Sequence, residues 1–179
     1  MMDKKGNIVT IIFFIFVLFF ILICGFIVVM GSAVLNYVFD IITPELTSLG
    51  EVGNVNFTLA GAMTITPLNS IIQSFTWLTG LIFIMALLGS IAIVVMARET
   101  PNGWLIGFYF LLMIVLVMGA MFMSNIYEDF YDDGDEISIR LKEHAILSFM
   151  ILYSPHILTI IGFIAGAILF SGIQSEVGI

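Results

Sequence analysis

Four long apolar runs, each free of Asp, Glu, Lys and Arg, constrain the fold of this chain more than any other feature of its sequence. They cover residues 8–30, 71–96, 104–123 and 145–170. An α-helix rises about 1.5 Å per residue, so about 20 apolar residues cross the hydrocarbon core of a bilayer. The runs predict an all-α integral membrane protein, with four transmembrane helices packed as an antiparallel bundle in one polytopic domain over residues 1–179.

Composition excludes several classes of protein. Hydrophobic residues make up 61% of the chain and charged residues 10%, whereas soluble domains average about 45–50% and about 25%. The formal net charge of −8 would repel a nucleic-acid backbone. The one cysteine, Cys24, excludes an internal disulfide and a multi-cysteine metal site. We therefore expect the lipid bilayer and other membrane subunits, of the same or a different chain, as partners, with no nucleic acid and no cofactor.

The distribution of basic residues predicts the orientation. Lys4, Lys5 and Arg98 fall on one side of the predicted spans, and Arg140 and Lys142 fall on the other. Cytoplasmic loops carry the excess of Lys and Arg, so both termini are predicted to be cytoplasmic. The first run is longer than the roughly 7–15 apolar residues of a signal peptide, so it is expected to be a retained anchor.

The segment between the first two spans, residues 31–70, is predicted to lie outside the membrane. Apolar residues at helical spacing extend the first helix to Pro44, which a helix interior disfavours. A separate short helix over residues 45–49 and a loop over residues 50–66, extended or with a short strand, are expected to follow. The second helix is expected to begin near Pro67.

The second outer segment, residues 124–144, is predicted to form a small acidic lobe. Its clear turn lies at residues 132–135, after which Asp135 suits a helix N-cap. From Glu136 the fourth helix is expected to run unbroken through its span, with an ion pair between Glu136 and Arg140. A tight turn at residues 99–103 predicts that helices two and three form a hairpin.

Two pairs of small residues, each spaced by one helical turn, are candidate helix-packing positions. They are Gly162 with Gly166 in the fourth span and Ala86 with Ser90 in the second. Small residues allow close van der Waals contact between helices in lipid, where apolar surface alone gains little. Whether such a pair packs inside the chain or against another subunit stays open.

His156 is the one histidine well inside a span, and an ionisable group there suggests a functional site. Pro155 cannot hydrogen-bond to the carbonyl of Ile151, which leaves a polar atom at similar depth. A polar path is one interpretation, and a neutral histidine hydrogen-bonded across the bundle is the other. The path would be formed by His156, Ser154, Gln73, Ser74 and Thr76.

The acidic stretch before the fourth span suggests a cation contact, because hard cations prefer clustered oxygen ligands. A helix-loop-helix calcium site fails, since loop position 12 counted from Asp129 would be Arg140. A weak contact or a solvated acidic turn remains, and it would involve Asp129, Asp132, Asp133 and Asp135.

The aromatic residues near the predicted span boundaries are expected to form interfacial belts. They are Trp77, Trp104, Tyr109, Tyr127 and Tyr131.

No paired nucleophile and base and no metal-binding set are visible at one depth, so we do not expect an enzyme. The sequence favours a non-catalytic structural or accessory subunit that anchors or braces a larger membrane-associated assembly. A virion membrane, an envelope complex and an energy-transducing complex are examples of such assemblies. The alternative is a small channel, transporter or membrane-lesion protein with a polar path near His156.

Overall fold

The computed structural model describes residues 5–53, 55–96 and 103–171, and this part of the chain is almost entirely helical. Its two strands pair antiparallel as a minimal hairpin, with Glu51 opposite Asn56. The elements in chain order are α1 (Lys5–Ser48), β1 (Glu51–Val52), β2 (Val55–Asn56), α2 (Phe57–Met96), α3 (Gly103–Asp132), α4 (Glu136–Glu143), α5 (Ala145–Leu152) and α6 (Ser154–Phe170).

Three helices, α1, α2 and α3, are long and apolar enough to cross a membrane. The successive helices α5 and α6 form a fourth candidate span, bent by 70° between them. Four spans were predicted, and by length and composition the described residues hold three to four helices that could cross a membrane. The prediction of an unbroken fourth helix from Glu136 is wrong, because the chain breaks at His144 and again at Tyr153.

The outer connection between α1 and α2 is shorter than predicted. Helix α1 continues through Pro44 to Ser48, so the separate helix over residues 45–49 is wrong. Helix α2 begins at Phe57 and also contains Pro67, so its predicted start near Pro67 is wrong, and the predicted loop is shorter and contains the two short strands.

Side-chain hydrogen bonds accompany both differences at the connection between α1 and α2. The Thr43 hydroxyl donates to the Phe39 carbonyl at 2.6 Å, within the helical turn that precedes Pro44. The Asn56 side chain accepts from the backbone N–H of Leu59 at 2.8 Å and thereby caps the first turn of α2. Asn56 is the residue in the sequence that indicates this early start. It was overlooked because the start of the helix was placed by proline alone.

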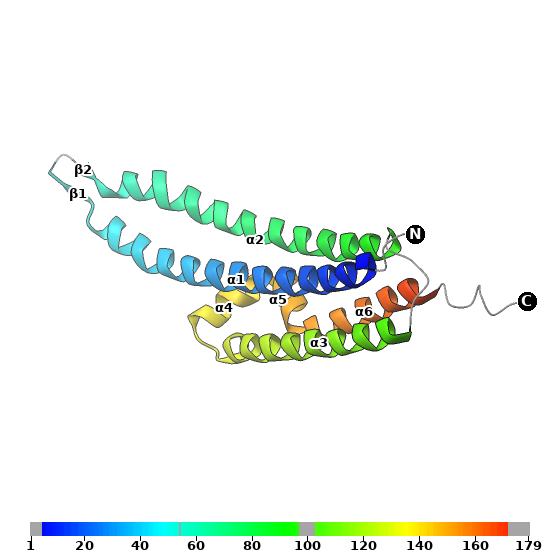
Figure 1. Cartoon of the computed structure of the whole chain (residues 1–179). Coiled ribbons are helices and arrows are strands. Elements are labelled where there is room, and N and C mark those ends of the chain that lie inside the picture. The colour runs from blue at the N-terminus through cyan, green and yellow to red at the C-terminus, as the bar shows by residue number, and fades with distance from the viewer. Residues whose placement is uncertain (1–4, 54, 97–102, 172–179) are drawn as a thin grey trace, which may run out of the picture.

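The helices are arranged around α1 (Figure 1). Helix α1 packs along α2 and also contacts α3, α4 and α5, while α6 contacts both α3 and α2. Helices α2 and α3 share little contact, so the predicted hairpin partnership between them is wrong. The turn at residues 99–103 lies mostly outside the described residues. The tip of the α1–α2 hairpin projects beyond the end of α3 and α4.

The buried apolar residues form two clusters. The larger lies among α1, α2, α3 and α6 and includes Leu18, Leu22, Phe83, Leu116 and Leu158. The smaller joins α4 and α5 to α1 and α3 through Val29, Ala33, Tyr127, Leu141, Leu147 and Ile151. Many large apolar side chains face outward instead, as expected where lipid or other apolar helices surround a helix.

The turn after α3 is confirmed. Gly134 adopts a positive φ of 78°, and Asp135 caps α4 by accepting from the Ser138 N–H at 2.7 Å. The predicted pair of Glu136 with Arg140 does not form. Arg140 instead contacts Asp40 on α1 and Glu143 on its own helix.

Candidate functional site

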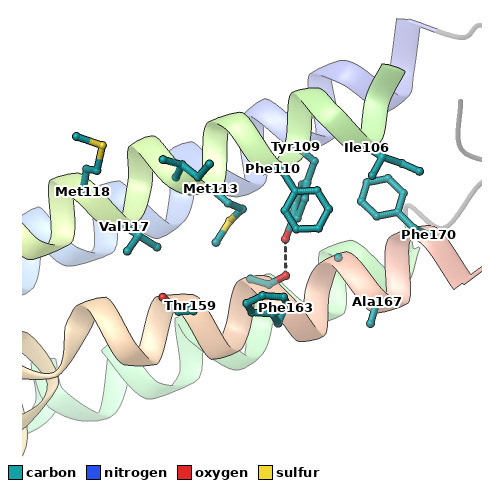
Figure 2. Close-up of a pocket in the computed structure, with 13 residues that line it drawn as sticks. Ile106, Tyr109, Phe110, Met113, Val117, Met118, Thr159, Phe163, Ala167 and Phe170 are labelled. Carbon is teal, nitrogen blue, oxygen red and sulfur yellow. Dashed lines mark hydrogen bonds between the residues drawn. The ribbon is translucent and has the colours of Figure 1, made fainter. Parts of the chain in front are cut away.

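The glycine pair of α6 lies at the contact with α3. A Cβ atom added to Gly162 would lie 1.9 Å from Met113 Cε, and one added to Gly166 would lie 3.0 Å from Tyr109 Cε1. The Tyr109 hydroxyl donates to the Gly162 carbonyl at 2.6 Å, as the dashed line in Figure 2 shows. The structure thus places both glycines at a contact inside the chain.

The outer side of this contact is a groove of about 560 Å³ between α3 and α6. Its lining is almost wholly apolar, and Figure 2 shows Tyr109, Met113 and Val117 of α3 extending toward α6. The groove offers contact to apolar chains and few partners for polar groups.

The second small pair lies on the buried stripe of α2. Ser90 is buried, and its hydroxyl donates to the Leu87 carbonyl within the same helix at 2.7 Å. Ala86 is half-buried beside Phe83 and Leu87, which belong to the larger core cluster.

The residues predicted to form a polar path are divided between surfaces. On α6, His156 is exposed, with its ring centroid 6.3 Å from that of Tyr153. Ser154 is buried, and its hydroxyl has no hydrogen-bond partner among the described residues. On α2, Gln73 lines a cavity against α4 and α5. Ser74 is exposed and donates to the Ser70 carbonyl, and the side chain of Thr76 lies outside the described part of the chain.

A side chain of the neighbouring helix α3 hydrogen-bonds to the backbone at the break before Pro155. The chain bends between α5 and α6, and Pro155 lies in the first turn of α6. The Ser124 hydroxyl on α3 donates to the Leu152 carbonyl at 2.6 Å. In an unbroken helix this carbonyl would accept from the N–H four residues later. The Ser124 hydroxyl and the Leu152 carbonyl therefore stabilise the bend.

The acidic residues before α4 do not gather into one site. Asp129, Asp132 and Asp133 are exposed, and Asp135 is used as the helix cap. Over residues 5–53, 55–96 and 103–171, no three His, Cys, Asp or Glu side chains are grouped so that they could hold a metal ion.

The junction of α4 and α5 carries the densest polar contacts, and we refer to residues 138–148 with their partners on α1 and α3 as the polar corner. His144 ends α4 and begins α5, and its Nε2 lies 3.1 Å from the Ser32 hydroxyl of α1. Burial lowers the pKa of His144, against the smaller opposing influence of the Glu143 carboxylate. The imidazole is therefore held toward its neutral form.

Charged side chains attach α4 to its neighbours. Arg140 contacts Asp40 of α1, and its Nη1 lies 2.7 Å from Glu143 Oε1. The Lys142 ammonium lies 5.2 Å from the centre of the Tyr131 ring on α3, a cation–π geometry. Helix α4 is thus fixed to both long helices beside it.

Buried hydroxyls complete the polar corner. Tyr127 Oη and Ser148 Oγ are 2.7 Å apart, and Ser148 also donates to the Leu141 carbonyl at 2.7 Å. The expectation that Tyr109 and Tyr127 belong to interfacial belts is wrong, because both are fully buried. The overlooked signal was a pair of phenolic hydroxyls in apolar helices, since such hydroxyls need partners once they are buried.

A cavity of about 490 Å³ opens between α2 and the polar corner. Gln73 and Trp77 line it from α2, and Arg140, Glu143 and His144 line it from the end of α4. The first turn of α5 completes the wall with Ala145, Ile146 and Leu147. Polar and apolar groups therefore meet at the level where two of the apolar runs begin.

Comparisons with protein-family models, curated proteins and solved structures give no match for this chain.

Proposed function

We propose that this chain is a non-catalytic, multi-pass membrane subunit that anchors or braces a larger membrane-associated assembly. In this proposal the four apolar runs cross the bilayer as an antiparallel bundle, with both termini on the cytoplasmic side. The projecting α1–α2 hairpin then lies on the opposite side, and it supplies the surface to which partners attach.

The observation that supports this proposal is the length of the hairpin. Helix α1 has 44 residues, which at about 1.5 Å per residue is roughly twice the thickness of the hydrocarbon core. The hairpin therefore extends far outside the lipid if its first half spans the bilayer. No other helix accompanies its tip (Figure 1).

The projecting part of the hairpin exposes apolar side chains on both helices. Its most exposed large apolar residues are Ile41, Leu49, Leu59, Met63 and Leu68. A contiguous apolar surface in water marks an interaction site. Its acidic residues are Glu45 and Glu51, and no Lys or Arg lies between Lys5 and Arg98. We expect a partner with an apolar surface and a basic rim.

Two experiments test this proposal. The chain should stay in the membrane pellet after alkaline carbonate extraction, and after mild solubilisation it should migrate with stoichiometric companions on blue-native electrophoresis. The double substitution Leu59→Gln with Met63→Gln should release the companions, while Thr66→Gln, also exposed on the hairpin, should leave them bound. Migration of the unsubstituted chain as a lone monomer would contradict the proposal.

The second function is a small channel, transporter or lesion protein. It rests on the polar residues near His156, but His156 and Gln73 belong to different surfaces, so we rank it lower. Solute flux through liposomes containing the purified chain, abolished by His156→Ala, would favour this function over the subunit.

A further inference from the structure

We propose that the cavity between α2 and the polar corner binds the headgroup of a zwitterionic phospholipid, whose phosphate faces the first turn of α5 and whose ammonium group faces Trp77 and Glu143. This inference rests on the proposal that the chain crosses a bilayer. It adds a specific lipid site to that function.

The position of the cavity fits the headgroup region. Gln73 and Trp77 lie near the start of the apolar run over residues 71–96, and Ala145–Leu147 open the run over residues 145–170. Two spans that are distant in sequence thus begin at one cavity. Trp77 is 61% exposed, and tryptophan favours the boundary between lipid and water.

The wall formed by α4 and α5 offers hydrogen-bond donors to a phosphate. His144 at the N-cap of α5 makes no side-chain cap hydrogen bond, while its carbonyl accepts from the Ser148 N–H at 2.9 Å. The N–H groups of the preceding residues, Ala145, Ile146 and Leu147, have no carbonyl within their own helix to bond. Oriented N–H groups of this kind suit a phosphate. Arg140 has five donors in all, and its contacts with Asp40 and Glu143 leave further N–H groups of the guanidinium for a phosphate.

Another part of the wall suits a cation. The Trp77 indole ring provides the aromatic face that attracts quaternary ammonium groups, and the Glu143 carboxylate, which also contacts Arg140, adds a negative charge. The carboxylates of Asp40 and Glu143 outnumber the single guanidinium of Arg140, and His144 is held neutral. A headgroup with a net negative charge is disfavoured by this balance, whereas a zwitterion meets both signs of charge.

The surface beside the cavity can also receive the acyl chains. Leu78 and Ile82 of α2 and Ile146 and Phe149 of α5 are exposed and lie deeper in the same two runs. By contrast, the groove between α3 and α6 is lined by apolar residues and offers few polar groups that could bind a headgroup. Lipids that share acyl chains but differ in headgroup therefore distinguish the cavity from the groove.

Native mass spectrometry of the full chain in detergent provides the test. Dioleoyl phosphatidylcholine and dioleoyl phosphatidylglycerol are added in equal amounts, and the ratio of retained lipids is measured. We expect phosphatidylcholine to be retained about two- to fivefold over phosphatidylglycerol. Equal retention of the two lipids would overturn the proposal.

Matched variants locate the binding. Trp77→Ala and Glu143→Gln should each remove most of the preference for phosphatidylcholine. Trp104→Ala should preserve it, because Trp104 is 64% exposed, similar to Trp77, and does not line the cavity. Thermal melting of all three variants checks folding, and Trp77→Phe, which retains an aromatic face, should keep part of the preference. An equal loss in the two alanine variants would contradict the assignment.

A soluble headgroup separates a lipid site from a site for a free phosphodiester. Glycerophosphocholine should displace the retained lipid only at a large excess, since it lacks the acyl chains. Displacement at equimolar concentration would overturn the lipid assignment. Carbonate extraction is independent of headgroup, so a chain that stays in the membrane pellet but shows no lipid preference fails this proposal alone.

Discussion

The contact between α3 and α6 and the polar corner at α4 and α5 hold helices together in different ways. The first consists of two glycines that admit the side chains of Tyr109 and Met113, with one hydrogen bond from a phenol to a carbonyl. The second uses hydroxyls, an imidazole and an ion pair over a short amphipathic helix.

This difference follows the expected solvent of each region. Apolar surface gains little from helix contact in lipid, so close packing at small residues stabilises the spans. Near the expected boundary between lipid and water, polar side chains can be buried and still form hydrogen bonds. Helix α4 accordingly carries both buried residues and charged ones. The two regions should therefore respond to different substitutions.

The largest effect is expected from Gly166→Leu at the contact of α3 and α6. Even a Cβ atom there lies 3.0 Å from the Tyr109 ring, so a larger side chain must separate the helices. We expect the free energy of unfolding in micelles to fall by about 2 kcal/mol. Gly89→Leu on α2 is the control, because nothing lies within 4 Å of that Cβ position. Equal melting of the two variants would refute the close contact.

Ser148→Ala should produce the next largest effect, and it tests the polar corner. The substitution removes a hydroxyl that joins Tyr127 to the Leu141 carbonyl, and it leaves the Tyr127 hydroxyl buried. We expect a loss of about 1–2 kcal/mol in unfolding free energy. Ser74→Ala, on an exposed surface of α2, should be nearly neutral. A neutral Ser148→Ala would show that the apolar contacts of α5 are sufficient.

Tyr109→Phe should have a smaller effect and shows how much of the contact of α3 and α6 depends on its hydrogen bond. The ring that fills the space beside Gly166 remains, while the bond to the Gly162 carbonyl is lost. Hydrogen bonds between membrane helices contribute about 0.6 kcal/mol on average. Chemical denaturation in micelles measures the difference. A loss as large as that of Gly166→Leu would mean that the bond, and not the close packing, dominates.

The smallest effect is expected from acidification, and it should be confined to the polar corner. Burial lowers the pKa of His144 below its usual 6.5, so the unfolded chain binds the proton more readily than the folded chain. Stability should therefore decrease as the pH falls through and below 6.5, and be fully retained above it. Melting temperatures between pH 7.5 and 5 measure this change. His144→Gln should reduce the slope, because it removes the titrating imidazole.

The sequence predicted the apolar helices well because length and the absence of charge determine which segments cross lipid. It also predicted the cap at Asp135, where a local hydrogen bond decides the helix start. It misplaced the start of α2, because Asn56 gives a stronger local cap than the later proline.

Tertiary features were harder to predict. In helices that are apolar on every side, periodicity does not reveal which face is buried, so the pairing of α3 with α6 had no local signal. His144, at which the chain breaks, contacts Ser32, more than a hundred residues earlier in the chain. The residues that form the polar corner are individually ordinary, and only the fold brings them together.

Helix α1 runs from Lys5 to Ser48 without interruption and contacts α2, α3, α4 and α5 along the way. If the chain crosses a bilayer as proposed, α1 joins the tip of the hairpin to the opposite face of the membrane through one continuous helix. A partner bound at β1 and β2 would then also constrain the tilt of the whole chain in the bilayer.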